Sequence, residues 1–444
     1  MSGPVNAPGP SRETSGFVSG TAAPTWEDAL VTGNGRQGAL CFGDAADLRI
    51  SLSHERLFLP VTEPLDPPDT AMVLPELRAA LLAGDRQSAA DRVCAVAVAG
   101  DPGFADTRWI DPLVGAATLR WRSLRPGPAV DHRRGTDFDT GVVTQRATDA
   151  AGVLTHRTVA SGPADAVVLW TVADGGTVDG LLRLDPVAGE PPVRIGFTSL
   201  VEPDRLRLVA EFPDRWAGAI AGYTVTCRLL AEGGTVVVDG TDLRVTGATS
   251  LLLVARVEVT APTAGPAGPG GPGGQGGQGG RAGPALARLL AVPPARLLAE
   301  HAAEHGRRFA RVGLRLGDLT GDEADDRTSE LLLADPGDPA LVARLFQAGR
   351  YAIMSSTGAL PPTLQGVWCG SYDPAWCSGY TLNGNLPTAL AAAVPTRATE
   401  QLLPLFDLLE GHLPDFRRNA RRLYGLAGIL LPTHCSAHGR QNHF

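Results

Sequence analysis

The feature that most constrains the fold is a low-complexity stretch in the middle of the chain. Residues 261–284 are mostly glycine, proline, glutamine and alanine, with almost no side chain that could be buried. We expect this stretch to be a flexible tract, because it has nothing to contribute to a hydrophobic core. The spacing of apolar residues differs on its two sides, so the chain is predicted to combine two architectures.

The region before the tract has β patterning. Residues 25–260 contain short apolar runs, such as 166–172, 235–238 and 251–254, which glycine, aspartate and proline turns separate. Closely spaced strands without intervening helices predict packed antiparallel sheets, as in a β-sandwich. Residues 75–99 carry apolar side chains at helical spacing and are predicted to be a helical insertion.

The region after the tract has helical patterning. Residues 285–330 are predicted to form a helical linker, with one face made by Leu286, Leu289, Leu290, Leu297, Leu298, His301, His305 and Phe309. A steady helix is expected after Asp338 as N-cap and Pro339 at the first helical position.

A second helix is predicted to run from Thr396 to a stop at Gly425, where Pro404 could introduce a kink. Its buried side is expected to present Leu402, Leu403, Phe406, Leu409, Leu413, Phe416 and Leu423.

Bulk properties exclude several classes of protein. A length of 444 residues exceeds one core and indicates two or three domains. The net charge of -8 without a basic cluster argues against nucleic acid, and no apolar run is long enough to span a bilayer. Residues 1–24 lack the pattern of a secretory signal and are expected to be a disordered lead-in. The six scattered cysteines favour free thiols, so we expect a cytoplasmic protein with no nucleic-acid or membrane partner.

The most informative chemistry lies in residues 360–385. Leu-Pro-Pro-Thr-Leu-Gln-Gly-Val-Trp at 360–368 precedes Asp-Pro-Ala-Trp at 373–376 and Asn-Gly-Asn at 383–385. Two side-chain amides one residue apart, just after two tryptophans, suit a site that stacks on a sugar ring and orients a small polar nucleophile.

This order of motifs resembles glycoside hydrolase family 95, the inverting α-L-fucosidases and their relatives. Further segments similar to the family follow in order and extend the resemblance from about Trp26 to the C-terminus. They are residues 26–30, 33–39, 42–43, 50–52, 137–141, 309–312 and 345–351. The resemblance implies an N-terminal β-sandwich, a helical linker and an (α/α)6 toroid.

The implied toroid needs more residues than follow the linker. Six helical hairpins require on the order of 200 residues, whereas residues 331–444 number 114. We therefore expect residues 331–444 to be the N-terminal part of an incomplete catalytic domain, in a chain that is a fragment.

The resemblance also implies an inverting reaction, in which a carboxylic acid protonates the leaving oxygen while water attacks the opposite face. It assigns the water to an asparagine pair, here Asn383 and Asn385. An amide would orient the water by accepting its hydrogen bond, and the general acid and assisting carboxylate are expected beyond Phe444. Substrate contacts are expected from Gln365, Trp368, Trp376, Tyr380, His434 and His438. The expected partner is an oligosaccharide or glycoconjugate, with no cofactor and no metal.

Each of these candidates also has a structural interpretation. The asparagine pair fits a turn, and both tryptophans and Tyr380 fit core packing. His434 and His438 are four residues apart, but the preceding Pro432 and the following Gly439 favour a loop over a metal site. His301 and His305 have the same spacing but no third ligand. We therefore expect a substrate contact for the first pair and a helix face for the second.

A dinucleotide fingerprint at residues 33–38, Gly-Asn-Gly-Arg-Gln-Gly, is rejected on physical grounds. That fingerprint needs a following helix whose N-terminus binds pyrophosphate. The pattern of residues 39–52 instead predicts strands and a turn. A tight hairpin turn is expected instead.

Departures from the family pattern leave the substrate open. Ser53-His54-Glu55 stands where the family typically has Asn-Glu-Asp, and Thr381-Leu382 replaces its His-Thr. An α-L-galactosidase is therefore an alternative to a fucosidase, because the two sugars differ at one exocyclic carbon. A catalytically inactive or carbohydrate-binding remnant of the family is a second alternative. A sugar phosphorylase fits less well, because two amides suit a neutral nucleophile better than phosphate.

Overall fold

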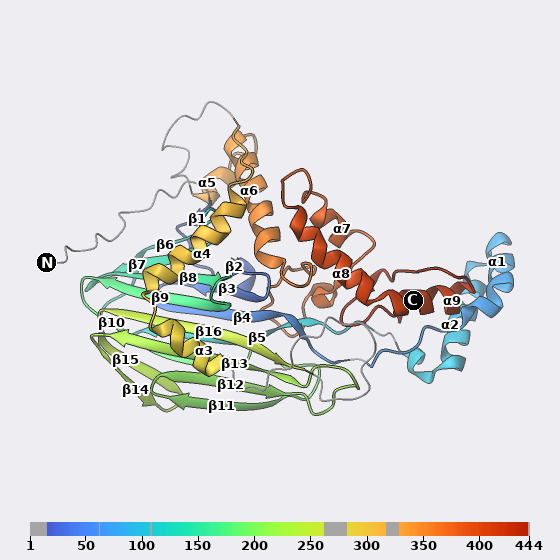
Figure 1. The fold of residues 1–444 in the computed structure, drawn as a ribbon, viewed down its shortest axis with the longest axis horizontal. Helices are drawn as coiled ribbons and strands as arrows, with labels where there is room; N and C mark the ends of the chain where they lie inside the picture. Colours follow the sequence, from blue (N-terminus) through green and yellow to red (C-terminus); the bar gives the residue numbers. More distant parts are fainter. Residues whose placement is uncertain (1–15, 62, 107–108, 262–281, 317–327, 443–444) are drawn as a thin grey trace.

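The computed structural model describes residues 16–61, 63–106, 109–261, 282–316 and 328–442. A β-sandwich is followed by helices that lie against one side and one end of it (Figure 1). The predicted order of a sandwich and then helices is confirmed.

The larger sheet of the sandwich has nine strands, and each neighbouring pair is antiparallel. In spatial order these are β1 (Gly16–Ser19), β6 (Val130–Asp137), β7 (Val143–Asp149), β8 (Gly152–Ser161), β9 (Ala166–Asp174), β16 (Ser250–Thr260), β13 (Gly222–Glu232), β12 (Arg205–Glu211) and β11 (Gly196–Glu202).

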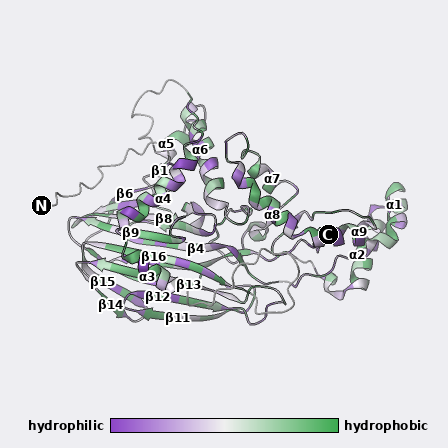
Figure 2. Ribbon diagram, in the orientation of Figure 1, coloured by the Kyte–Doolittle hydropathy of each residue, from purple (hydrophilic) through white to green (hydrophobic). Residues whose placement is uncertain are grey.

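The smaller sheet has seven strands, again all antiparallel. They are β14 (Thr235–Asp239), β15 (Asp242–Ala248), β10 (Val178–Asp185), β5 (Leu113–Ser123), β4 (Asp47–Phe58), β3 (Gln37–Gly43) and β2 (Leu30–Gly33). Hydrophobic and hydrophilic residues alternate along many strands (Figure 2), as expected for sheets buried on one face.

The main core lies between the two sheets and includes a buried histidine. His156 of β8 bonds Thr171 Oγ1 through Nδ1 at 2.8 Å and the Ala45 carbonyl through Nε2 at 2.9 Å. Its ring meets the indole of Trp121, from β5, edge-on at 6.0 Å. Burial lowers the pKa of His156 to about 4, so the ring is neutral in the folded protein.

The described helices fall into an insertion and a C-terminal group. The insertion holds the 3-10 turn η2 (Thr70–Val73), α1 (Leu74–Leu82), α2 (Arg86–Gly100) and η3 (Pro102–Ala105), and η1 (Trp26–Asp28) precedes β2. The C-terminal group comprises α3 (Ala282–Leu290), α4 (Pro294–Phe309), α5 (Ser329–Leu333), α6 (Pro339–Ser356), α7 (Asn385–Leu390), η6 (Thr399–Leu402), α8 (Leu403–Gly411) and α9 (Leu413–Tyr424). The predicted helical insertion is thus confirmed as a pair of helices, which lies beside α9 (Figure 1).

The linker helices pack as the sequence predicts. Leu286, Leu297 and Leu298 of α3 and α4 form a core with strands of the larger sheet, and His301 and His305 stack at 5.6 Å on the buried face of α4. At the N-terminus of α6, the Asp338 side chain accepts a hydrogen bond from Ala340 N, which confirms the predicted cap.

The expected disordered lead-in needs correction. Residues 16–19 of the expected lead-in form β1, because Val18 packs inward and the strand pairs with β6; residues 1–15 lie outside the described part. The low-complexity tract lies mostly outside it as well, although α3 already begins at Ala282.

The helix predicted over residues 396–424 is divided into η6, α8 and α9. One boundary lies between Leu402 and Leu403, directly before Pro404, where a kink is expected, and a second break falls at His412. Gly425 ends α9 in the left-handed conformation, with φ 68°, as predicted. Leu403 and Phe406 are exposed rather than buried, because no described element covers their face.

No helix in the described ranges is both long and apolar enough to cross a bilayer.

The buried histidines predict acid sensitivity. The folded-state pKa of His54 and His301 is lowered to about 3, and that of His156 and His438 to about 4, mainly by burial. Since the unfolded chain binds these protons first, stability is full above about pH 6.5 and falls as the pH approaches 4, by up to about 1.4 kcal/mol per pH unit for each histidine.

Denaturant unfolding between pH 7.5 and 4.5 should show this slope, and His156→Gln should reduce it. The exposed variant Gln87→Ala on α2 should leave the slope unchanged. Equal slopes for wild type and His156→Gln would contradict the assignment.

Candidate functional site

The segment after α6 is anchored to the sandwich by a buried tryptophan. The Trp368 indole is 8% exposed and packs against Leu40 and Val367. Its Nε1–H donates to the Thr32 carbonyl at 2.8 Å. Trp368 is therefore a packing residue, and the structure does not support its predicted contact with a sugar.

Glycines of the β2–β3 hairpin allow this close approach. Gly35, with φ 84°, donates its N–H to the Ser355 carbonyl at 2.8 Å, and a Cβ there would lie 2.2 Å from the Thr357 carbonyl oxygen. A Cβ on Gly38 would lie 2.9 Å from the Val367 carbonyl oxygen. The hairpin predicted for residues 33–38 is confirmed, and its glycines make room for the segment after α6.

A second anchor is the carboxylate of Glu55, which is 5% exposed at the end of β4. Its Oε2 accepts a hydrogen bond from Leu360 N at 3.0 Å. Its Oε1 has no hydrogen-bond partner among the described residues and lies 3.8 Å from Arg56 Nε and 3.9 Å from Arg36 Nε. Burial raises the pKa of Glu55, against the opposing effects of the Leu360 N–H and the two arginines.

A strained turn follows at η5 (Ala375–Ser378). Trp376, Cys377 and Ser378 have φ angles of 52°, 56° and 45°, which are unfavourable for residues other than glycine. The buried Ser378 hydroxyl holds the turn by bonding Thr363 Oγ1 at 2.9 Å. The turn projects the Trp376 side chain into solvent, where it is 65% exposed.

Two short strands, β17 (Tyr380–Thr381) and β18 (His434–Cys435), pair next to the turn. Tyr380 is 1% exposed and packs against Phe58 at 5.9 Å, and its hydroxyl has no partner in the described part of the chain. Burial raises the pKa of the Tyr380 phenol well above its ordinary value. Its ring belongs to the core, so the structure does not support the predicted contact between Tyr380 and substrate.

A hollow of about 400 Å³ opens beside these strands. Its lining residues are Thr363, Leu364, Thr381, Gly384, Asn385, Leu386, Thr388 and Ala389. The Thr381 hydroxyl is buried without a partner among the described residues, as is Oε1 of Gln365, which follows Leu364. The lining of the hollow thus combines threonine and asparagine side chains with apolar ones, and none of its residues carries a charge.

The two predicted asparagines lie at the entrance to α7. Asn385 is its first residue and lines the hollow, while Asn383 lies in the preceding turn, and both side chains are exposed.

His434 and His438 are buried away from the lining. His434 faces Thr381 across the strand pair. Nδ1 of His438 accepts a hydrogen bond from Arg440 N at 3.2 Å, and its ring meets Trp216 edge-on at 6.5 Å. The structure does not bring either histidine to the lining of the hollow, so the predicted substrate contacts lack support.

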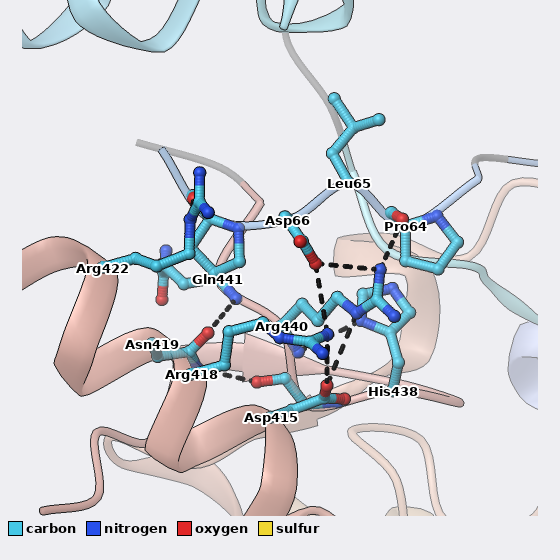
Figure 3. A network of polar contacts seen from close by, with 12 residues as sticks. Pro64, Leu65, Asp66, Asp415, Arg418, Asn419, Arg422, His438, Arg440 and Gln441 are labelled. Atoms are coloured by element: carbon cyan, nitrogen blue, oxygen red, sulfur yellow. Dashed lines mark hydrogen bonds and ion pairs between the residues drawn. The ribbon is translucent and has the colours of Figure 1, made fainter. Parts of the chain in front are cut away.

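The segment around His438 belongs to a network of ion pairs (Figure 3). Asp415 on α9 accepts from Gly439 N at 3.0 Å and pairs with Arg440 Nε at 3.4 Å. Arg440 also donates to the Pro64 carbonyl at 3.0 Å and pairs with Asp66 at 3.5 Å. This network joins α9, residues 436–442 and the connection between β4 and the helical insertion.

Among the described residues, no group of three or more His, Cys, Asp or Glu side chains is arranged to hold a metal ion.

Comparison with known proteins decides the family. Residues 293–443 match the glycosyl hydrolase family 95 catalytic domain, and residues 18–262 match the glycosyl hydrolase family 65, N-terminal domain. The C-terminal part of the chain, residues 293–443, belongs to glycoside hydrolase family 95.

Curated relatives of this family 95 chain include "Probable alpha-fucosidase A" from Aspergillus niger and "Alpha-L-fucosidase 2" from Arabidopsis thaliana. The first is 39% identical over 134 residues, covering 29% of this chain and 17% of the relative. The second is 33% identical over 139 residues, covering 30% and 16%. The matched segment is thus less than a fifth of each relative's length.

A solved structure, "Putative kojibiose phosphorylase from human microbiome", shares the fold. The alignment covers 97% of this chain and 54% of that chain, with a TM-score of 0.56 and 8% sequence identity. This likeness places the family 95 chain in the class of a β-sandwich followed by an (α/α)6 toroid.

Of the eight predicted site residues, the structure brings only Asn385 into the lining of the hollow, with Asn383, Gln365 and Tyr380 next to lining residues in sequence. Sequence reasoning missed the threonines at 363, 381 and 388 and the anchoring role of Glu55. Thr381 was visible as a departure from the family pattern, but its unpartnered hydroxyl depends on the tertiary structure.

The Glu55 anchor gives a prediction about stability. Glu55→Ala should lower the free energy of unfolding at pH 7 by about 2 kcal/mol, because the Leu360 N–H loses a charged acceptor. Glu55→Gln keeps an acceptor and removes a buried charge, so it should be at least as stable as wild type at pH 7. Since the folded-state pKa of Glu55 is raised, any gain for Glu55→Gln should shrink as the pH falls and the carboxylate takes up a proton.

Denaturant unfolding at pH 7 and pH 5 measures both variants. The anchor is misassigned if Glu55→Gln loses as much stability as Glu55→Ala.

Proposed function

We propose that this chain forms part of an inverting glycoside hydrolase that removes terminal α-L-fucosyl residues, with Asn383 and Asn385 orienting the attacking water. Membership of family 95 and relatives named as α-fucosidases support the hydrolase class and the sugar.

The main support for the proposal is that neither asparagine side chain stabilises a left-handed turn or caps a helix. A turn would favour asparagine where φ is positive, but neither Asn383 nor Asn385 is among the residues with positive φ. A helix start would use an asparagine side chain as N-cap, but the residue before α7 is Gly384 and no side chain caps it. Two exposed amides, Asn385 in the lining of the hollow and Asn383 two residues before it, without a left-handed turn or capping role, are suited to hold a ligand or a water molecule.

The lining of the hollow suits a deoxy sugar. The Thr388 hydroxyl and the Asn385 amide, both on exposed residues, can bond sugar hydroxyls, whereas Leu364, Leu386 and Ala389 offer apolar surface for a methyl group. An α-L-galactosyl residue would place a hydroxymethyl group there. The preference for a fucosyl residue should therefore be modest, roughly 10- to 100-fold.

A second candidate is a carbohydrate-binding protein that does not hydrolyse its ligand. It is favoured by the lining, because none of the residues around the hollow is an aspartate or glutamate that could act as general acid.

The amide pair gives the decisive test. In the enzyme of which this chain is part, Asn383→Ala and Asn385→Ala should each lower kcat on an aryl α-L-fucoside by about 100-fold or more, because the water loses its orientation, while KM changes little. Nuclear magnetic resonance should show the β-anomer of L-fucose as the first product of that enzyme.

Gln87→Ala, an exposed amide on α2, is the matched control and should keep full activity. Full activity in Asn383→Ala would remove the asparagine pair from the mechanism. Binding of L-fucose without turnover by the enzyme of which this chain is part would favour the carbohydrate-binding candidate.

A further inference from the structure

Two exposed tryptophans meet near the hollow, and they come from opposite parts of the chain. Trp109 precedes β5 of the sandwich and is 46% exposed, and Trp376 lies in η5. Their ring centroids are 5.9 Å apart and their planes are 77° apart. The pair therefore presents two apolar ring surfaces, nearly perpendicular to each other, at the protein surface.

Both side chains are held by buried neighbours. Trp109 is followed by Ile110 and Asp111, both buried; Asp111 accepts hydrogen bonds from Val61 N at 2.9 Å and Trp216 Nε1 at 3.0 Å. A Cβ on Gly379 would lie 2.1 Å from Ile110 Cδ1, so the segment of Trp109 packs directly on the turn that carries Trp376.

The pair lies next to the hollow. Ser378, two residues after Trp376, bonds Thr363 of the lining, and the Gly379 carbonyl accepts from N of Leu364, another lining residue, at 3.0 Å. Two residues span at most about 7 Å of chain, so the tryptophan pair is within the reach of a second sugar unit.

We propose that Trp109 and Trp376 form an outer subsite that stacks the pyranose ring to which the terminal sugar is attached. This subsite rests on the proposed function, since it takes the hollow as the place of the terminal residue. The ligand class is a neutral oligosaccharide rather than a free monosaccharide, because indole faces bind the C–H surfaces of a pyranose ring. The unfavourable backbone at Trp376 is consistent with a side chain held out for binding rather than packing.

The test compares two ligands by isothermal titration with the chain: free L-fucose and a trisaccharide that ends in α-L-fucose linked to galactose. Trp109→Ala should weaken binding of the trisaccharide about three- to tenfold and leave binding of L-fucose unchanged. Trp109→Phe and Trp376→Phe, which keep an aromatic ring, should retain most of the affinity. Trp376→Phe is chosen in place of Trp376→Ala because it avoids misfolding of the turn.

Phe197→Ala, which removes an exposed ring from β11 on the far part of the sandwich, is the control and should change neither affinity. If Trp109→Ala binds both ligands as wild type does, the proposed outer subsite is contradicted. The assignment of the terminal sugar to the hollow is unaffected by that result. If Thr388→Val and Asn385→Ala also leave L-fucose binding unchanged, the proposed place of the terminal sugar fails instead.

Discussion

The contact between the β2–β3 hairpin and the segment after α6 is the constraint on which the site depends. Gly33 has the same role as Gly35 and Gly38, since a Cβ on it would lie 2.4 Å from the Ser355 carbonyl oxygen. Side chains at these glycines would force the end of α6 away from the sandwich. The Trp368 indole then occupies the space beside Gly33 and Gly38 and hydrogen-bonds Thr32. The glycines that match the dinucleotide fingerprint thus allow close packing between the β-sandwich and the helical part of the chain.

This contact fixes the walls of the hollow in sequence. The Glu55 carboxylate holds Leu360, and the chain continues directly to Thr363 and Leu364 of the lining. Thr363 then fixes Ser378, and the Gly379 carbonyl fixes Leu364. A displacement at the sandwich edge would therefore move both the hollow and the exposed tryptophan of η5. The sandwich is part of the site's support although it contributes no residue to the lining.

The sequence predicts those parts of the structure that local signals determine. The cap at Asp338, the stop at Gly425 and the helical face of His301 and His305 depend on neighbours in sequence, and each is confirmed. The two tryptophans of the motif region show the limit. Trp368 and Trp376 look alike in sequence, but one is buried by a glycine hairpin more than 300 residues away and the other is exposed by a local backbone conformation. The exposure of Leu403 and Phe406 could not be predicted from local sequence either, because it depends on which elements cover that face of α8.

The chemistry of the lining separates binding from hydrolysis. Amides and hydroxyls can hold a sugar and orient a water molecule, but an amide neither donates a proton to a leaving group nor removes one from water at neutral pH. The buried carboxylates of Glu55 and Asp111 accept hydrogen bonds from protein groups, Glu55 from Leu360 N and Asp111 from Val61 N and Trp216 Nε1, and both lie outside the lining. Recognition of the sugar can thus arise from the residues around the hollow alone. Turnover requires a carboxylic acid that faces the hollow from some other element, so the affinity for the sugar and the rate of cleavage should respond to different substitutions.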